Sequence, residues 1–147
     1  MALRYLPQTD DAKDVVHDSF LKVFSHIREF NYRGAGSLRA WVLKIVANEA
    51  VNMLRKSERF SFVDDIPDEP DVEPPDLDEV PPEEINRMIG LLPSGYRTVF
   101  NLFVFEQMSH KQIAEMLGIK ENSSASQFLR AKKMLKKLIN DYHHTRT

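Results

Sequence analysis

The stretch SHKQIAEMLGI, residues 109–119, decides the fold of the second half of the chain. Ser109 is a good helix N-cap. Ala114 is small enough for a second helix to cross closely, and Gly118 suits the left-handed position of a tight turn. The helix that Ser109 is predicted to cap carries the apolar residues Ile113, Ala114 and Leu117. A small residue, a glycine four positions later and then the apolar Ile119 together indicate a helix-turn-helix.

The second helix of this motif is predicted to begin at Asn122 or Ser123 and to run to about Ile139. Its core face is predicted to comprise Ser124, Phe128, Ala131, Leu135 and Leu138. Residues 111–147 contain eight Lys or Arg against three acidic residues. A basic helix can be merely solvated, but a basic second helix in a helix-turn-helix is typical of a reader of the DNA major groove.

Two more helices are predicted immediately before this motif. The first covers residues 83–92 and has the apolar positions Ile85, Met88, Ile89 and Leu92. Pro93 opens the second, whose apolar positions are Tyr96, Val99, Phe100, Phe103 and Val104. Residues 83–147 therefore form one helical module.

The beginning of the chain predicts a second helical module. Residues 3–6 read as the end of a helix stopped by Pro7, and Thr9 is a good N-cap for the next helix. The buried stripe of that helix is predicted to be Val15, Val16, Phe20, Val23, Phe24 and Ile27. Asp11, Asp14 and Asp18 fall on another face, which is either a solvated acidic face or a docking surface for a basic partner.

A loop with two glycines, residues 30–36, separates this helix from the next. Ser37 is predicted to cap the following helix, which runs to about Arg55. Its core stripe is predicted to be Leu38, Trp41, Val42, Ile45 and Val46, with Trp41 in the core rather than stacked on a base. Polar residues along this helix are either surface filler or groups that contact base edges and phosphates. They are Arg39, Lys44, Asn48, Asn52, Arg55 and Lys56.

The net charge of −2 over 147 residues hides a segregation of signs along the chain. Residues 61–86 hold 11 acidic residues, six of the eight prolines and no Lys or Arg, and the rest of the chain has a net charge of +9. Such a stretch cannot bury enough apolar area to offset its ordering entropy, so we expect an extended linker. The predicted fold is all-α, with modules over 1–60 and 83–147 joined by a linker over 61–82.

Composition excludes several classes of protein. The chain has no cysteine, which excludes disulfides, zinc-finger modules and thiol catalysis and fits the reducing cytoplasm. Its apolar stretches are only a few residues long, so no membrane insertion is expected. The five histidines have no spacing typical of a metal or nucleophile site, and no glycine-rich phosphate-binding motif is present. An enzyme is therefore disfavoured.

Several motifs in this order resemble the extracytoplasmic-function (ECF) sigma factors of bacterial RNA polymerase. They are residues 11–20, residues 36–42, Leu92-Pro93, Tyr96-Arg97, Val99-Phe100, residues 109–119, Ser126 and Leu129-Arg130-Ala131. The resemblance implies a protein that directs the polymerase to specific promoters and helps to melt them, without catalysis, cofactor or metal of its own. The implied partners are core RNA polymerase, promoter DNA and an anti-sigma factor.

The resemblance also implies three sets of contact residues. Asp14, His17, Asp18 and Leu21 would bind the coiled coil of the polymerase's largest subunit. Tyr32 and Arg33 in the loop, with Asn48, Asn52, Arg55 and Lys56, would capture the −10 element, including an extruded base. Ser123, Ser124, Ser126, Gln127, Arg130 and Lys133 would contact the −35 element.

The chain departs from the family's pattern in three places. The usual first helix of the N-terminal module is missing before Leu3, which indicates either a truncated chain or a misplaced start. His17 stands where Gln is common, and Ala125 and Gln127 replace basic residues in the reading helix. The competing hypothesis is a stand-alone helix-turn-helix regulator, which would need a ligand pocket or symmetric half-site binding.

Overall fold

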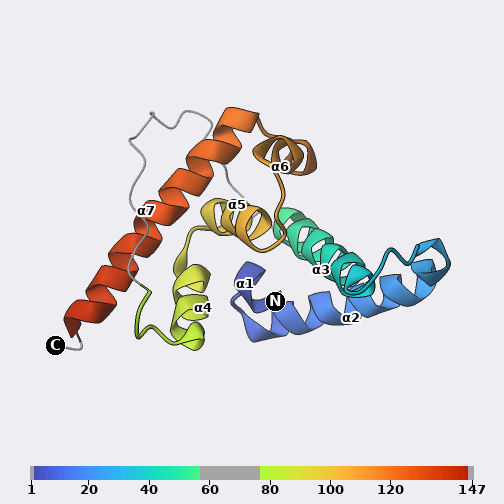
Figure 1. The fold of residues 1–147 in the computed structure, drawn as a ribbon, viewed down its shortest axis with the longest axis horizontal. Helices are drawn as coiled ribbons and strands as arrows, with labels where there is room; N and C mark the ends of the chain where they lie inside the picture. The colour runs from blue at the N-terminus through green and yellow to red at the C-terminus, as the bar shows by residue number, and fades with distance from the viewer. Residues whose placement is uncertain (1, 57–76, 146–147) are drawn as a thin grey trace. The chain divides into compact units, whose positions relative to one another are not determined.

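The computed structural model describes residues 2–56 and 77–145, and every regular element within these ranges is helical, which confirms the predicted all-α fold class. The chain divides into two compact units, Met1–Arg59 and Phe60–Thr147 (Figure 1). Most of the linker predicted over 61–82 lies outside the described residues.

Over residues 2–56, the first unit is built from three α-helices and a short 3₁₀ turn. These are α1 (Ala2–Tyr5), α2 (Thr9–His26), η1 (Ile27–Glu29) and α3 (Ser37–Lys56). Figure 1 shows α2 and α3 side by side, joined by the loop after η1, and α1 packs on both. An ion pair between Lys22 and Glu49 also joins α2 to α3. The helix predicted to be capped by Thr9 begins at Thr9 itself, and Gln8 occupies the N-cap without a side-chain hydrogen bond.

The buried face of α2 differs from the predicted stripe. The buried residues are Ala12, Val15, Ser19 and Val23. The predicted core residues Val16, Phe20, Phe24 and Ile27 are exposed instead, and Phe24 is 73% exposed. The physical reason is that α2 has apolar residues on more than one side, but α1 and α3 cover only one of these sides. The apolar residues on the uncovered side are therefore exposed.

The core of α3 lies in its second half, whereas the sequence placed it in the first. Ala47, Ala50, Val51 and Leu54 are buried, whereas Leu38 is exposed and Trp41, Val42, Ile45 and Val46 are half-buried. Trp41 packs against Phe30, with 5.3 Å between ring centroids. The Ser37 hydroxyl accepts a hydrogen bond from the Arg33 N–H at 3.2 Å, so it closes the loop rather than capping the helix.

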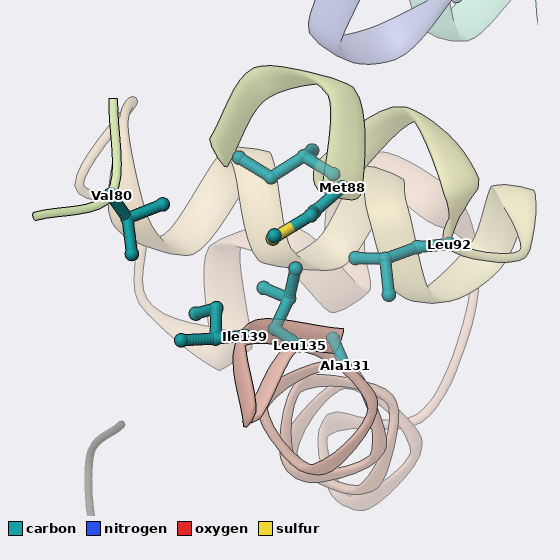
Figure 2. Close-up of a cluster of buried hydrophobic side chains, with 7 residues drawn as sticks. Val80, Met88, Leu92, Ala131, Leu135 and Ile139 are labelled. Atoms are coloured by element: carbon teal, nitrogen blue, oxygen red, sulfur yellow. The ribbon is translucent and has the colours of Figure 1, made fainter. Parts of the chain in front are cut away.

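The described part of the second unit, residues 77–145, contains four α-helices. They are α4 (Pro82–Leu91), α5 (Ser94–Val104), α6 (His110–Leu117) and α7 (Glu121–Thr145). The first three all pack on α7, which extends six residues beyond the predicted end at Ile139. Figure 2 shows Met88 and Leu92 facing Ala131 and Leu135 across the core. The full core cluster is Val80, Met88, Ile89, Leu92, Ala131, Leu135 and Ile139.

Polar side chains are buried in α5, which the sequence did not predict. Arg97 donates from Nη1 to the carbonyl oxygens of Gly90 at 3.3 Å and Leu92 at 3.1 Å. These carbonyls belong to the end of α4, where a helix has no partners of its own for them. Thr98 and Asn101, on the same helix as Arg97, are fully buried. Arg97 therefore joins α5 to the end of α4 through the interior of the unit.

Candidate nucleic-acid interface

The turn between α6 and α7 has the predicted helix-turn-helix geometry. The Ser109 hydroxyl accepts from the Gln112 N–H at 3.1 Å, and the Gln112 side chain accepts from the Ser109 N–H at 2.9 Å, which forms a capping box. Gly118 has φ 68°, the left-handed conformation that glycine adopts without steric cost. The N–H groups of Gly118 and Ile119 both bond to the Ala114 carbonyl. The predicted motif is confirmed.

An aromatic cluster joins the two helices of the motif to each other and to α5. The His110 ring stacks on Phe103 of α5 with 4.6 Å between centroids, and Phe103 in turn lies 4.4 Å from Phe128 of α7. His110 Nδ1 lies 2.8 Å from the hydroxyl of Ser124. Burial lowers the pKa of His110 below its ordinary value, and the nearby Glu121 carboxylate opposes this shift.

Three of the six residues expected to contact −35 DNA are buried in the interior of the motif. Ser123 and Ser124 lie in the first turn of α7 against the rest of the unit, and Gln127 is only 1% exposed. A side chain enclosed in this way presents little of its surface to solvent. Ser123, Ser124 and Gln127 therefore lie in the interior of the motif rather than on its surface.

The other three expected −35 residues share the outward side of α7. Ser126, Arg130 and Lys133 are four and three positions apart, which aligns them along one helical face. Ser126 and Arg130 are half-buried, and Lys133 is exposed. Lys137, four positions after Lys133, is also exposed and extends the same side. The outward face thus combines a small polar residue near the start of the helix with cations further along.

The residues expected at the −10 element lie on exposed parts of the first unit. Tyr32 is 75% exposed, and Arg33 follows it in the loop. Asn48, Asn52 and Arg55 are exposed and recur at helical spacing along α3, with the exposed Lys44 one turn before them. The side chain of Lys56 lies outside the described residues.

The residues expected to bind the polymerase form one ridge on α2. Asp14, His17, Asp18 and Leu21 are all exposed and occupy the positions i, i+3, i+4 and i+7 of one helical face. The exposed residues Val16, Phe20 and Phe24 interleave with them along α2, so acidic and apolar side chains occur together. The sequence pattern did not predict that these three residues are exposed. Helical periodicity shows which sides of a helix are apolar, but not which of those sides other helices cover.

The part of the chain that the structure describes has neither a metal-ligand cluster nor a membrane-spanning helix. No group of three or more His, Asp or Glu residues there is placed to hold a metal ion. None of the described helices has the length and apolar character to cross a membrane.

Comparison with known proteins identifies the family. Sigma-70 region 2 matches residues 1–60, and Sigma-70, region 4, matches residues 82–135. The RNA polymerase sigma factor SigV of Bacillus subtilis is 27% identical over 136 residues, which cover 92% of this chain and 80% of that protein. The ECF RNA polymerase sigma-E factor of Haemophilus influenzae is 29% identical over 151 residues, covering 92% and 78%.

The chain belongs to the ECF sigma factors. As a sigma factor it directs RNA polymerase to promoters for the initiation of transcription. Sigma factors are non-enzymatic initiation factors. The fold of this sigma factor is also similar to that of the sigma factor RpoE from Bartonella quintana, solved in complex with the anti-sigma factor NepR. That match has a TM-score of 0.60 at 21% identity and covers 95% of this chain and 87% of RpoE.

Proposed function

We propose that α7 reads the −35 promoter element through Ser126, Arg130 and Lys133. The observation that carries this proposal is their alignment on the outward face of the second helix of a formed helix-turn-helix. In this motif the residues near the start of the second helix contact base edges. Ser126 and Arg130 are close enough to the start for base contact, whereas Lys133 lies one turn further on and meets phosphate.

Two substitutions in the holoenzyme test this division of roles. Arg130→Ala is expected to cost about 1–3 kcal/mol on the preferred −35 sequence and to narrow the gap to mutant sequences. Lys133→Ala is expected to weaken binding to all sequences alike and to reduce the salt slope by about one. Gln127→Ala is the control: because Gln127 is buried, its replacement should change stability without changing sequence preference. Equal, sequence-independent losses from Arg130→Ala and Lys133→Ala would contradict the assignment.

For the first unit, the proposal is that Tyr32, Arg33, Asn48, Asn52, Arg55 and Lys56 capture the −10 element and help to open it. Unstacking one base costs a few kcal/mol, which contacts to the extruded base can recover. The exposed Tyr32 ring is suited to stack on such a base, a contact worth about 1–3 kcal/mol. Tyr32→Ala should reduce permanganate reactivity of −10 thymines in the open complex while leaving −35 binding unchanged.

We further propose that the ridge of Asp14, His17, Asp18 and Leu21 docks on core polymerase. Its two carboxylates suit a basic partner surface, and the exposed Phe20 and Phe24 add apolar area nearby. Asp14→Lys with Asp18→Lys should weaken holoenzyme assembly measured by co-purification with core enzyme. Glu29→Lys with Asp141→Lys makes the same change of charge at exposed positions outside α2, and should assemble normally. Equal assembly by both double variants would leave the ridge as a solvated face.

Three further features belong to this proposal. The catalytic step is assigned entirely to the polymerase, and the cytoplasm is assigned as the location because polymerase and promoter DNA are there. An anti-sigma factor is proposed as a regulator, by analogy with the complex of RpoE and NepR. Run-off transcription with purified core enzyme, with and without a co-purifying protein, tests both the sigma activity and its inhibition.

A further inference from the structure

One imidazole connects three helices of the second unit. His110 is the first residue of α6, and its ring lies nearly parallel to that of Phe103 in α5, at 15° between planes. The same ring is tilted against Phe128 of α7, with 5.8 Å between centroids. Its Nδ1 atom lies 2.8 Å from Oγ of Ser124, which is fully buried in the first turn of α7. His110 therefore fixes that first turn by a ring contact and a hydrogen bond.

The residues of α7 that His110 contacts alternate with those that face outward. Ser124 and Phe128 form the inner contacts, and Ser126 and Arg130 lie between and just beyond them on the outward side. An α-helix transmits a change of orientation along its axis because its backbone hydrogen bonds hold successive turns together. The position of the His110 ring therefore sets the direction in which Ser126 and Arg130 point.

This arrangement suits the neutral imidazole. A charged ring loses hydration when it is half-buried between aromatic side chains, and the first turn of a helix disfavours a cation. The charged groups near the ring come from α7: Glu121 acts on it directly, and the Lys132 nitrogen lies 5.2 Å from the centroid of the Phe128 ring. From α5 the ring meets the uncharged Phe103. The Glu121 carboxylate is outweighed, because the pKa of His110 is lowered.

We propose that His110 is a positioning residue for −35 recognition, whose neutral imidazole holds the first turn of α7 in the orientation that promoter binding requires. The proposal rests on the function assigned above to the outward face of α7. Protonation favours movement of the ring toward water, which breaks the contacts with Phe103 and Ser124. Recognition of the −35 element then becomes weaker as the pH falls, by a route independent of the contacts with DNA.

The test measures the affinity of holoenzyme for a promoter duplex at pH 7.5 and pH 5.5. His110→Phe keeps an aromatic ring but removes the hydrogen bond, and should lower affinity about 2- to 10-fold at pH 7.5, the equivalent of one net hydrogen bond. At pH 5.5 the difference from the wild type should narrow, because the protonated fraction of the wild-type imidazole rises as the pH falls. His110→Asn, whose amide can occupy the place of Nδ1 and does not titrate, should restore part of the affinity.

Ser124→Ala removes the other partner of the hydrogen bond. It should cost as much as His110→Phe, and the two changes together should cost no more than either alone. His144→Phe is the matched control, since His144 is exposed near the end of α7 and bonds to the Asn140 carbonyl of its own helix. It should alter neither the affinity nor its pH dependence.

The outcomes distinguish a failure of the positioning role of His110 from a failure of the −35 assignment on which it rests. A His110→Phe loss that stays the same at both pH values, or adds fully to the Ser124→Ala loss, would overturn the positioning role. A loss with Arg130→Ala but none with His110→Phe also overturns the positioning role and leaves the −35 assignment intact. No loss with Arg130→Ala overturns the −35 assignment itself. Circular dichroism at both pH values identifies any variant that has merely unfolded, and His110→Asn then carries the comparison.

Discussion

Two residues in left-handed backbone flank α6, and only one of them is a glycine. Gln107, in the loop before the capping box, has φ 55°, and Gly118, after the helix, has φ 68°. For a residue with a Cβ, this backbone conformation has a steric cost of about 1–2 kcal/mol. Glycine avoids that cost, but its larger loss of chain entropy on folding costs about 0.5–1 kcal/mol more. Gln107→Gly should therefore raise the free energy of unfolding by roughly 0.5–1 kcal/mol in urea titration. Gln107→Ala keeps the Cβ and should bring no gain.

At the same scale, His110 should make the stability of the protein depend on pH. Its pKa is lowered in the folded protein from the ordinary value of 6.5, so the unfolded chain binds this proton more readily. The contribution to stability is complete above pH 6.5 and is lost as the pH falls through the folded pKa. The urea midpoint of the wild type should fall more steeply on acidification than that of His110→Phe. Parallel pH profiles would show that this imidazole titrates normally in the folded state.

At the scale of the element, the end of α4 depends on a side chain from the next helix. Arg97 bonds to the carbonyls of Gly90 and Leu92, and hydrogen bonds to charged groups contribute about 1.5–3 kcal/mol each. Arg97→Met should lower the free energy of unfolding by about 2–3 kcal/mol because it strands these carbonyls. Arg87 on α4 provides the control: it pairs with Glu84 at 3.0 Å on the surface, and Arg87→Met should cost about 0.5 kcal/mol or less. Similar losses for both variants would mean that the buried arginine acts only by filling space.

The individual helices show which features of the fold could be predicted from the sequence and which could not. The turn between α6 and α7 was predictable because Ser109, Ala114 and Gly118 each answer a local steric or hydrogen-bonding demand. The burial of Gln127 was not, because helical periodicity counts apolar residues and a buried amide depends on the other helices around it. The exposure of Phe24 could not be predicted either. The sequence shows that this side of α2 is apolar, but not whether another helix packs on it. The sequence therefore predicted the helix-turn-helix but not which side of α7 is buried, and three of the six residues expected at the −35 element lie in the interior.

At the scale of the whole molecule, each unit has a core of its own, and the single tryptophan reports on one of them. Trp41 packs on Phe30 in the first unit, and Leu135 is buried in the core of the second. Leu135→Ala should destabilise the second unit by about 2–5 kcal/mol and lower its melting transition by circular dichroism. The transition followed by Trp41 fluorescence should keep its midpoint. A matching shift in the fluorescence transition would show that the two units unfold as one.

The separation of the inner and outward faces of α7 also bears on how such a protein can change its targets over generations. Replacements at Ser126, Arg130 or Lys133 leave the core side chains Ala131, Leu135 and Ile139 in place. Surface changes of this kind usually alter stability by no more than about 0.5 kcal/mol. A duplicated gene could therefore drift toward a new promoter preference while its product stays folded throughout, and a genome could acquire several regulons from one ancestral helix.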